Sequence, residues 1–593
     1  MELPVCKSWL GAKRLAENAK EIIVKLRVLL CAALACPLAL LAGQGQSKSV
    51  SPTSASEIPR LRKQGTATQL IVDGKPFLAL AGELMNSSAT SLEYMKPVWP
   101  DLAKAKLNTL LPGVSWNQIE PQPGKFDFTV LDGVIQGART RNMRLVLLWF
   151  GSWKNSLSGY APDWVKKDFE RFPRAQVAGG KSIELLSPFS DANRDADARA
   201  FAALMRHIKA VDGREHTVVM IQVENEVGMR GDSRDRSPLA NQAFAGPVPK
   251  ELTDYLQKHK DNLIPEFRQV WEAAGFKTSG TWEEVFGQSR VTDGIFMAWN
   301  FARYIGRVVE AGKAEYPIPM FVNAALYGLA RGPNPPSGGR PWDLVMDVWR
   351  AGGPQIDFLA PDPHTVSDYA AFCAKYTQSG NPLFIPETNG GPGSAARMIY
   401  AFGRYDAIGY SPFAIERWVG KDPELAGVDD FLSRMAPLIT AHQGKGTMSA
   451  VLLGPKDPPQ KVHLGNYTLE ASYLTPPVMP ANSPPRETLP TSAAILIAAG
   501  PDEYFIAGSG VKVAFSSNTP GTPLAGLGTV EEGTFVNGRW VPGRQLAGDD
   551  TGQGDYVGLW GFMKSAGWPG DVGPENLFLR DLSIQRVTLY RYR

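Results

Sequence analysis

Eight short apolar runs, each followed by a segment with helical spacing, recur between about residues 68 and 440 of the chain. Strands that are apolar along their whole length are typical of parallel sheets covered by helices on both faces. Eight such repeats predict a (β/α)8 barrel of the α/β class. The alternative is an open doubly wound sheet, but no glycine-rich phosphate-binding turn follows the first run. The expected strands span residues 77–82, 109–114, 144–150, 217–223, 319–324, 356–360, 382–386 and 407–413.

Two regions depart from this repeat. Residues 229–294, after the fourth run, contain a polar loop and a helix-like stretch over 250–275, and loops after barrel strands commonly shape specificity. Beyond about residue 445 the chain has short β-rich runs broken by Gly and Pro, with a proline-rich linker at 476–485. The runs lie at 494–498, 503–507, 510–515 and 586–591. We expect a barrel domain over residues 46–440 and a smaller all-β, sandwich-like domain over 441–593.

The first 45 residues differ in composition from the rest. Lys25 and Arg27 precede an apolar run over 28–42, which is short of the roughly 20 residues that span a bilayer. We expect a secretory signal peptide and an exported protein, periplasmic or extracellular; a membrane anchor or a lipid tether at Cys36 is the alternative. Three of the four cysteines lie in this leader, so the exported chain keeps only Cys373 and no disulfide is expected.

The charge balance argues against one class of partner. The chain has 62 Lys and Arg residues against 59 Asp and Glu residues, and the leader carries the whole formal charge of +3. Nucleic-acid binding needs a basic surface that releases phosphate counterions, so a formally neutral remainder argues against it. The six histidines show no metal-ligand spacing, and no phosphate-binding Walker loop is present. We expect no metal and no cofactor.

Two glutamates stand where barrel enzymes carry their chemistry, at the carboxyl ends of strands. The fourth run ends in Val-Glu-Asn-Glu, with Glu224, Asn225 and Glu226, and the seventh ends in Ile-Pro-Glu-Thr-Asn, with Glu387. Glycoside hydrolysis needs two carboxyl groups in one cleft: a protonated acid for the leaving oxygen and an ionised group for the anomeric carbon. A structural ion pair is the alternative. Alternation along a strand sends Glu224 and Glu226 to the same side, so periodicity leaves the choice between them open.

The sequence around these residues resembles glycoside hydrolase family 35, the β-galactosidases. The stretch Gln-Val-Glu-Asn-Glu-Val-Gly at 222–228 is similar to the acid/base segment of that family. The resemblance implies that Glu226 is the acid/base, that Asn225 binds the sugar and that Glu387 is the nucleophile. The context of Glu387 departs from the aromatic-rich run common in the family.

Three further motifs extend the resemblance over the barrel. Residues 114–128, with Trp-Asn, Glu-Pro and Gly-x-Phe-x-Phe, are similar to the second-strand signature of the family. Residues 81–88 and 148–155 look like the first- and third-strand loops of a bacterial branch that has its own β-rich C-terminal domain. This branch implies sugar contacts at Trp153, Lys154 and Asn155, although the third-strand loop differs from that of animal and plant members. The C-terminal part resembles the branch only in general character.

Other side chains near the expected strand ends are candidates for sugar contacts. Asn86 and Glu83 follow the first strand, and Glu120 follows the second, where we expect it to brace the site by pairing with a cation. Aromatic rings stack on the apolar face of a sugar, but core packing is the alternative for most of the 15 tryptophans. The aromatic candidates are Trp116, Trp149, Trp153, Tyr410 and Trp418.

Together these features predict a retaining exo-β-galactosidase that removes terminal β-galactosyl residues from oligosaccharides or polysaccharides through a covalent glycosyl-enzyme intermediate. In retaining enzymes the two carboxyl groups lie about 5 to 5.5 Å apart, against roughly 6.5–9.5 Å in inverting ones. The alternatives are another retaining β-glycosidase, such as a β-glucosidase, β-mannosidase or arabinosidase, and a non-catalytic carbohydrate-binding barrel. We expect a galactose-containing substrate as the partner, with no nucleic acid and no membrane other than through an anchor.

Overall fold

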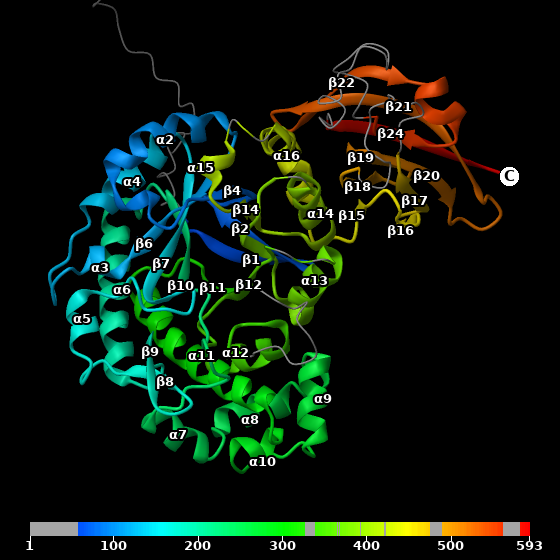
Figure 1. Cartoon of the computed structure of the whole chain (residues 1–593). Coiled ribbons are helices and arrows are strands. Elements are labelled where there is room, and N and C mark those ends of the chain that lie inside the picture. The colour runs from blue at the N-terminus through cyan, green and yellow to red at the C-terminus, as the bar shows by residue number, and fades with distance from the viewer. Residues whose placement is uncertain are drawn as a thin grey trace, which may run out of the picture. The chain divides into compact units, whose positions relative to one another are not determined.

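The computed structural model describes residues 57–325, 338–364, 366, 368–391, 393–419, 421, 423–474, 489–560 and 582–593 (Figure 1). The expected leader and the expected linker at 476–485 lie outside these residues. The described chain contains a parallel barrel, from strand β4 to strand β14, and an antiparallel β-rich part that begins at β15. The predicted fold class is confirmed.

Eight parallel strand positions form the barrel, in the spatial order β12-β11-β10-β7-β5-β4-β14-β13, with β6 also paired to β7. β5 and β6 share one position and are separated by Pro112, which has no N–H to donate to a neighbouring strand. The side chain of Asn381, just before β13, connects it to β12. Its Oδ1 accepts from the N–H of Leu359 at 3.1 Å, and its Nδ2 donates to the carbonyl of Leu359 at 2.9 Å. The strands are β4 (Ala79–Glu83), β5 (Thr109–Leu111), β6 (Gly113–Ser115), β7 (Arg144–Lys154), β10 (Val218–Asn225), β11 (Met320–Ala325), β12 (Phe358–Asp362), β13 (Phe384–Thr388) and β14 (Gly409–Pro412).

Strand residues alternate between the barrel interior and the layer of helices outside it. The interior core includes Ala79 and Ala81 of β4, and Phe358 and Ala360 of β12. This packing makes the interior a core and not a pore. Two side chains of β2 join it from a three-stranded sheet that we did not predict: β1 (Arg60–Gln64), β2 (Ala67–Val72) and β3 (Lys75–Phe77).

Helices follow the barrel strands, as predicted, and the two longest, α6 and α11, pack against each other. The helical stretch expected over 250–275 is two helices, α8 and α9, because Pro265 lacks an N–H and begins the second. The principal helices are α2 (Leu92–Lys104), α4 (Thr129–Arg139), α6 (Asp191–Asp212), α7 (Pro238–Ala245), α8 (Lys250–Lys258), α9 (Pro265–Ala273), α10 (Trp282–Phe286), α11 (Arg290–Glu315), α12 (Met346–Gly352), α13 (Tyr369–Tyr376), α14 (Ser394–Tyr405) and α16 (Pro423–His442). Three short helices, α3 (Trp116–Ile119), α5 (Asp163–Lys167) and α15 (Ile415–Trp418), lie in loops.

The C-terminal part is a continuous antiparallel sheet that surrounds its own hydrophobic core, so the all-β prediction is confirmed. Its main strand order is β15-β18-β19-β24-β21-β20-β17-β16, with β22 paired to β21 and β23 paired to β20. The strands are β15 (Met448–Leu453), β16 (Gln460–Leu464), β17 (Tyr467–Tyr473), β18 (Ser492–Gly500), β19 (Glu503–Ser509), β20 (Val511–Ser517), β21 (Leu524–Val536), β22 (Arg539–Leu546), β23 (Val557–Gly558) and β24 (Ser583–Tyr592).

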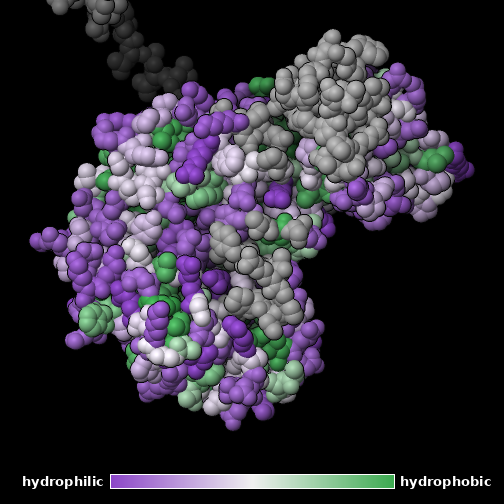
Figure 2. Space-filling model, in the orientation of Figure 1, coloured by the Kyte–Doolittle hydropathy of each residue, from purple (hydrophilic) through white to green (hydrophobic). Residues whose placement is uncertain are grey.

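The described surface is largely hydrophilic on the face that Figure 2 shows, with hydrophobic residues scattered among polar ones. Exposed large hydrophobic side chains such as Tyr94, Phe169 and Tyr590 lie far apart in the sequence. Among the described residues, no helix combines the length and the apolar character needed to cross a membrane.

Candidate active site

The two predicted catalytic glutamates lie together at the carboxyl ends of their strands. Glu226 follows β10 and Glu387 belongs to β13, and both are buried, with 1% and 4% of their surface exposed. One carboxylate oxygen of each lies within 4.8 Å of the other. This spacing falls in the short range of retaining glycoside hydrolases, below the roughly 6.5–9.5 Å of inverting enzymes, which must fit a water between the carboxyl groups.

The backbone leaves the regular strand conformation at the carboxyl end of β10. Glu224 and Glu226 have φ angles of 62° and 48°, in the left-handed region that non-glycine residues rarely adopt. Two hydrogen bonds hold this segment: the Glu226 N–H donates to Asn323 Oδ1 at 2.9 Å, and Ser156 Oγ donates to the Glu226 carbonyl at 2.9 Å. The side chains of the two glutamates therefore do not follow the alternation of a regular strand.

Glu224 faces helix α6, outside the barrel, so the expectation that it shares a side with Glu226 is wrong. Its carboxyl group accepts hydrogen bonds from the N–H groups of Ser152 at 3.0 Å and Trp153 at 2.6 Å. Asp197 of α6 accepts from the N–H and the hydroxyl of the same serine. Burial and the neighbouring Asp197 raise the pKa of Glu224 well above its ordinary value. Glu224 thus supports the bulge of β7 that precedes Lys154.

Lys154 supplies a buried cation to the site. Its Nζ donates to Asn225 Oδ1 at 2.8 Å and lies 5.3 Å from the centre of the Phe150 ring. Its positive charge opposes the rise in the pKa of Glu226 and helps to lower the pKa of Glu387. The structure therefore brings two of the predicted sugar-binding residues, Lys154 and Asn225, to the catalytic pair.

His364, a residue without any motif spacing, contacts Glu387. It follows β12, with Nε2 3.0 Å from Glu387 Oε1 and Nδ1 3.1 Å from Asn389 Oδ1. The Asn389 amide nitrogen donates to the His364 carbonyl, which turns the amide oxygen toward the ring. Both ring nitrogens therefore face acceptors, and such a ring is held in its doubly protonated, cationic form. Sequence reasoning missed this contact because the partners lie on different strands, 23 positions apart.

The two catalytic glutamates have opposite pKa shifts. Burial, with the negative charge of Glu387, raises the pKa of Glu226 to about 7. Burial also opposes ionisation of Glu387, but the hydrogen bond from His364 and the charge of Lys154 outweigh it and hold the pKa of Glu387 below its ordinary value. Glu387 is therefore the ionised member of the pair and Glu226 the protonated one, which is the division of roles that a retaining mechanism needs.

Two more carboxyl groups belong to the site. Glu83 ends β4 and Asp362 ends β12, and both are fully buried. Burial, followed by the charge of Glu387, raises the pKa of each well above its ordinary value. Glu83 was a sequence candidate, whereas Asp362 was not. Side chains alternate along β12, and Phe358 and Ala360 face inward, so the same alternation places Asp362 inward. This pattern was the sequence signal for Asp362.

Three of the predicted sugar-binding aromatic residues pack in the core instead. Trp153 is fully buried, with its ring centre 4.4 Å from that of Tyr304, and its indole N–H donates to a backbone carbonyl. The indole of Trp116 donates to Glu120 at 2.9 Å, so Glu120 braces that ring, and within the described part of the chain it has no cation as the expected partner. Tyr410 is fully buried, with its hydroxyl 3.4 Å from a serine of α14. These three rings therefore lie where core packing, the alternative to sugar stacking, places them.

The other candidates lie in loops near the strand ends. Asn86 is half-buried, and among the described residues its Oδ1 has no hydrogen-bond partner. Asn155 has an exposed side chain and a left-handed backbone with φ 53°, and its N–H donates to the Asn225 carbonyl at 3.2 Å. Trp418 lies against Gly390, in the loop that follows the nucleophile position. Asn155 therefore contributes to the site through its backbone.

Glu226, His364 and Glu387 place ligand atoms within 4.8 Å of one another, close enough to hold a metal ion. A histidine binds a metal ion through an unprotonated ring nitrogen. Nε2 of His364 instead faces the ionised Glu387 carboxylate and carries the N–H of that hydrogen bond. The cation of Lys154 adds a second positive charge beside the same carboxylates. The donor set therefore fits proton transfer better than metal binding.

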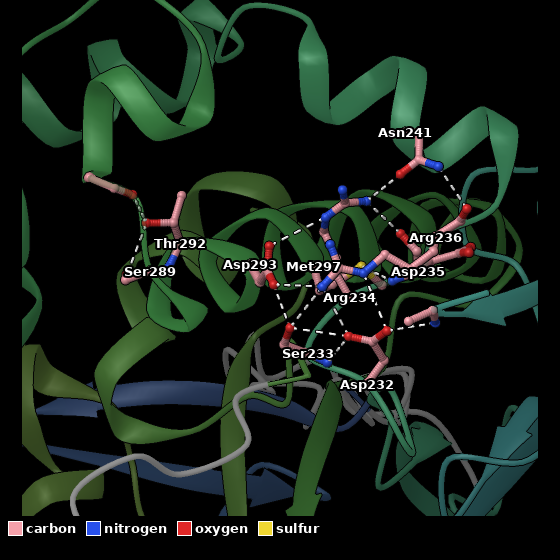
Figure 3. Close-up of polar contacts among 12 residues, drawn as sticks. Asp232, Ser233, Arg234, Asp235, Arg236, Asn241, Ser289, Thr292, Asp293 and Met297 are labelled. Carbon is pink, nitrogen blue, oxygen red and sulfur yellow. Dashed lines mark hydrogen bonds and ion pairs between the residues drawn. The ribbon is translucent and has the colours of Figure 1, made fainter. Parts of the chain in front are cut away.

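A second charged cluster lies in the insertion after β10 (Figure 3). Arg236 pairs with Asp232 at 3.0 Å and with Asp293 of α11 at 3.1 Å, and Arg234 pairs with Asp293 at 3.3 Å. Asp235 accepts three hydrogen bonds at 2.7–2.9 Å, two of them from backbone N–H groups. Each carboxylate oxygen of this cluster has a donor or a cation in reach, so the cluster fixes the loop that follows Glu226.

A buried carboxyl pair at this spacing, on the fourth and seventh strands of a (β/α)8 barrel, is the arrangement of a glycoside hydrolase. Residues 99–292 match a family model described as β-galactosidase, of glycoside hydrolase family 42. This segment contains Lys154, Asn225 and Glu226 and ends before Glu387. The barrel therefore carries a segment of β-galactosidase type. Residues 430–558 match a domain of unknown function.

A curated β-galactosidase from Xanthomonas manihotis is 28% identical over 185 residues, which are 29% of this chain and 27% of that protein. The chain thus matches about a quarter of the length of this relative. Among solved structures, a β-galactosidase from Bacillus circulans sp. alkalophilus aligns with a TM-score of 0.43 at 14% identity, over 61% of this chain and 57% of that chain. A β-galactosidase from the Antarctic haloarchaeon Halorubrum lacusprofundi aligns with a TM-score of 0.42 at 16% identity, over 60% and 58%.

Proposed function

We propose that this protein is a retaining β-galactosidase that releases terminal β-galactosyl residues from oligosaccharides or polysaccharides. The observation that carries the proposal is the buried Glu226–Glu387 pair, with oxygens within 4.8 Å and opposite pKa shifts. The family model that matches residues 99–292 is that of family 42. On the motifs around Glu226 alone we propose family 35 as the finer assignment, in the bacterial branch with a β-rich C-terminal domain.

The proposed reaction has two steps. In the first, Glu387 attacks the anomeric carbon while Glu226 gives its proton to the departing glycosidic oxygen, which leaves a glycosyl ester on Glu387. Glu226 is a carboxylate once its proton has gone, and esterification removes the negative charge that helps to raise its pKa, so it stays ionised. In the second step Glu226 takes a proton from water, and the water oxygen displaces Glu387 from the sugar with overall retention.

Galactose is the sugar that the matched segment and the named relatives favour. Another retaining β-glycosidase of the same fold, such as a β-glucosidase, β-mannosidase or arabinosidase, is the competing assignment. A non-catalytic carbohydrate-binding barrel is a weaker alternative, because binding alone does not require paired carboxyl groups with separated pKa values.

The test is a panel of 4-nitrophenyl glycosides hydrolysed by the purified full chain. We expect the highest kcat/KM on the β-D-galactoside, loss of about 10⁴-fold or more in Glu387→Gln, and unchanged rates in a control variant of an exposed glutamate, Glu170→Gln. Release from another β-glycoside but not from the galactoside would overturn the choice of sugar. A lack of turnover on every glycoside would overturn the hydrolase assignment.

We also propose that the protein is exported, to the periplasm or beyond. The support is the basic pair Lys25 and Arg27 followed by the apolar run 28–42. Expression of the full chain and of a variant without residues 1–45, followed by cell fractionation, tests this. The full chain is expected outside the cytoplasm and the shortened chain inside it, and equal distribution would contradict export.

A further inference from the structure

Glu83 and Asp362 have no part in the two-step reaction above, yet both carboxyl groups face the catalytic pair. Glu83 follows Ala79 and Ala81 in the inward-facing positions of β4. Asp362 takes the equivalent position of β12, after two inward-facing core residues. Both therefore rise from the interior core at the end of the barrel where Glu387 lies, and its charge acts on both.

These carboxyl groups are left without the partners that buried polar groups normally have. Both oxygens of Glu83 and the Oδ1 of Asp362 are buried, and within the described chain they have no hydrogen-bond partner. The other Asp362 oxygen accepts from Asn323 Nδ2 at 2.7 Å. A buried polar group without a partner costs free energy, so its persistence calls for a ligand that supplies the missing bonds.

The unpartnered atoms converge on one place. Beside those of Glu83 and Asp362, Glu226 Oε1 is also buried without a hydrogen-bond partner in the described chain. The Asn225 amide lies there too, where its contact with Glu387 helps to lower the pKa of that group. The set mixes donors and acceptors closely spaced around the reacting pair. An uncharged polyol, with a hydroxyl group on nearly every carbon, matches such a set.

We propose that the carboxyl groups of Glu83 and Asp362 bind hydroxyl groups of the glycosyl unit that lies between Glu226 and Glu387. This proposal rests on the proposed function and names how the same site holds its sugar. The raised pKa of both groups supports it, because a protonated carboxyl group offers one O–H donor and one acceptor to a hydroxyl group. In Asp362 the proton belongs on Oδ1, since Oδ2 already accepts from Asn323.

The experiment pairs a change in the protein with a change in the sugar. Kinetics of wild type, Glu83→Gln and Glu83→Ala are measured on the 4-nitrophenyl β-D-galactoside and on its 2-, 3-, 4- and 6-deoxy analogues. We expect Glu83→Ala to lose about 10- to 100-fold in kcat/KM on the parent sugar. On the one analogue that lacks the partner hydroxyl, wild type and Glu83→Ala are expected to be equal within about threefold.

Two comparisons separate sugar binding from a structural effect. Glu83→Gln keeps one donor and one acceptor and is expected to recover most of the activity that Glu83→Ala loses. Asp429→Ala removes another buried carboxyl group, in α16, whose raised pKa has burial as its cause. It is expected to lower the melting temperature without changing kcat/KM.

Asp362→Ala and Asp362→Asn are tested in the same way, as the disabling and the conservative variant. Calorimetry of galactose binding to Glu387→Gln with and without Glu83→Ala measures affinity independently of turnover. If wild type hydrolyses a different glycoside, the deoxy series of that sugar is used, so a wrong sugar does not count against Glu83. Equal losses for Glu83→Ala on the parent and on every deoxy analogue would overturn the proposal. Wild-type kinetics in both Glu83→Ala and Asp362→Ala would do so as well.

Discussion

Two clusters of charged side chains, one at the carboxyl ends of the barrel strands and one in the insertion after β10, differ in how completely their carboxylate oxygens are partnered. In the insertion cluster, defined by Asp232, Arg234, Asp235, Arg236 and Asp293, every carboxylate oxygen meets a donor or a cation (Figure 3). In the active-site cluster, several carboxyl oxygens have no hydrogen-bond partner among the described residues. The carboxylate oxygens are thus all partnered in the insertion cluster, whereas several in the active site are not.

The pKa shifts show what this difference means. Burial opposes ionisation of Asp232, but hydrogen bonds from Arg236 and two backbone N–H groups lower its pKa to about 2. Burial and a like charge raise the pKa of Glu226 to about 7. The hydrogen bonds of Asp232 keep its carboxylate ionised, whereas Glu226, whose Oε1 has no hydrogen-bond partner in the described chain, keeps a proton that it can transfer. Hydrogen bonds are one part of this difference and burial beside a like charge is the other, because Glu224 accepts two hydrogen bonds and still has a raised pKa beside Asp197.

After the nucleophile variant Glu387→Gln, the largest effect is expected from Glu226→Gln. The amide cannot donate a proton to a leaving group, so kcat for an alkyl or sugar leaving group is expected to fall by about 10²- to 10⁴-fold. A 2,4-dinitrophenyl leaving group needs no proton, and its release is expected to be nearly unaffected in the first step. Equal losses on both substrates, measured in steady-state and burst kinetics, would show that Glu226 is not the acid.

A change in the insertion cluster is expected to act on stability instead. Asp235→Ala leaves three buried donors without an acceptor, and we expect the free energy of unfolding to fall by about 3 kcal/mol. Asp254→Ala, which breaks an exposed ion pair, serves as the control and is expected to cost less than about 0.5 kcal/mol. Urea denaturation and kcat/KM per folded molecule measure the two effects. A loss of activity of 100-fold at unchanged stability would remove the distinction between the clusters.

His364→Phe is expected to have the smallest effect and to shift the pH profile. Glu387 must be ionised to attack, and the His364 hydrogen bond and charge lower its pKa. Without them that pKa rises, so the acid limb of kcat/KM moves to higher pH, by about one unit. The same cation lowers the pKa of Glu226, so the alkaline limb also moves up. His442→Asn, a partly buried histidine at the end of α16, is the control, and an unmoved acid limb in His364→Phe would contradict the assignment.

The barrel was predictable because its strands are buried on both faces and read as apolar runs. The placement of Glu226 and Glu387 together at one end of the barrel was predictable because both follow apolar runs that end as barrel strands. The expectation that Glu224 and Glu226 point to the same side failed, because both have a left-handed backbone. His364 was out of reach, because its contact with Glu387 exists only after two strands come together.

The most direct test of the account is covalent trapping of the nucleophile. A 2-deoxy-2-fluoro-galactosyl donor with a good leaving group slows both steps and allows the glycosyl ester to accumulate, and digestion followed by mass spectrometry locates it. The account predicts one label per chain, on Glu387, in the peptide that contains Ile-Pro-Glu-Thr-Asn. A label on another carboxyl group, or hydrolysis with inversion and no label, would contradict it.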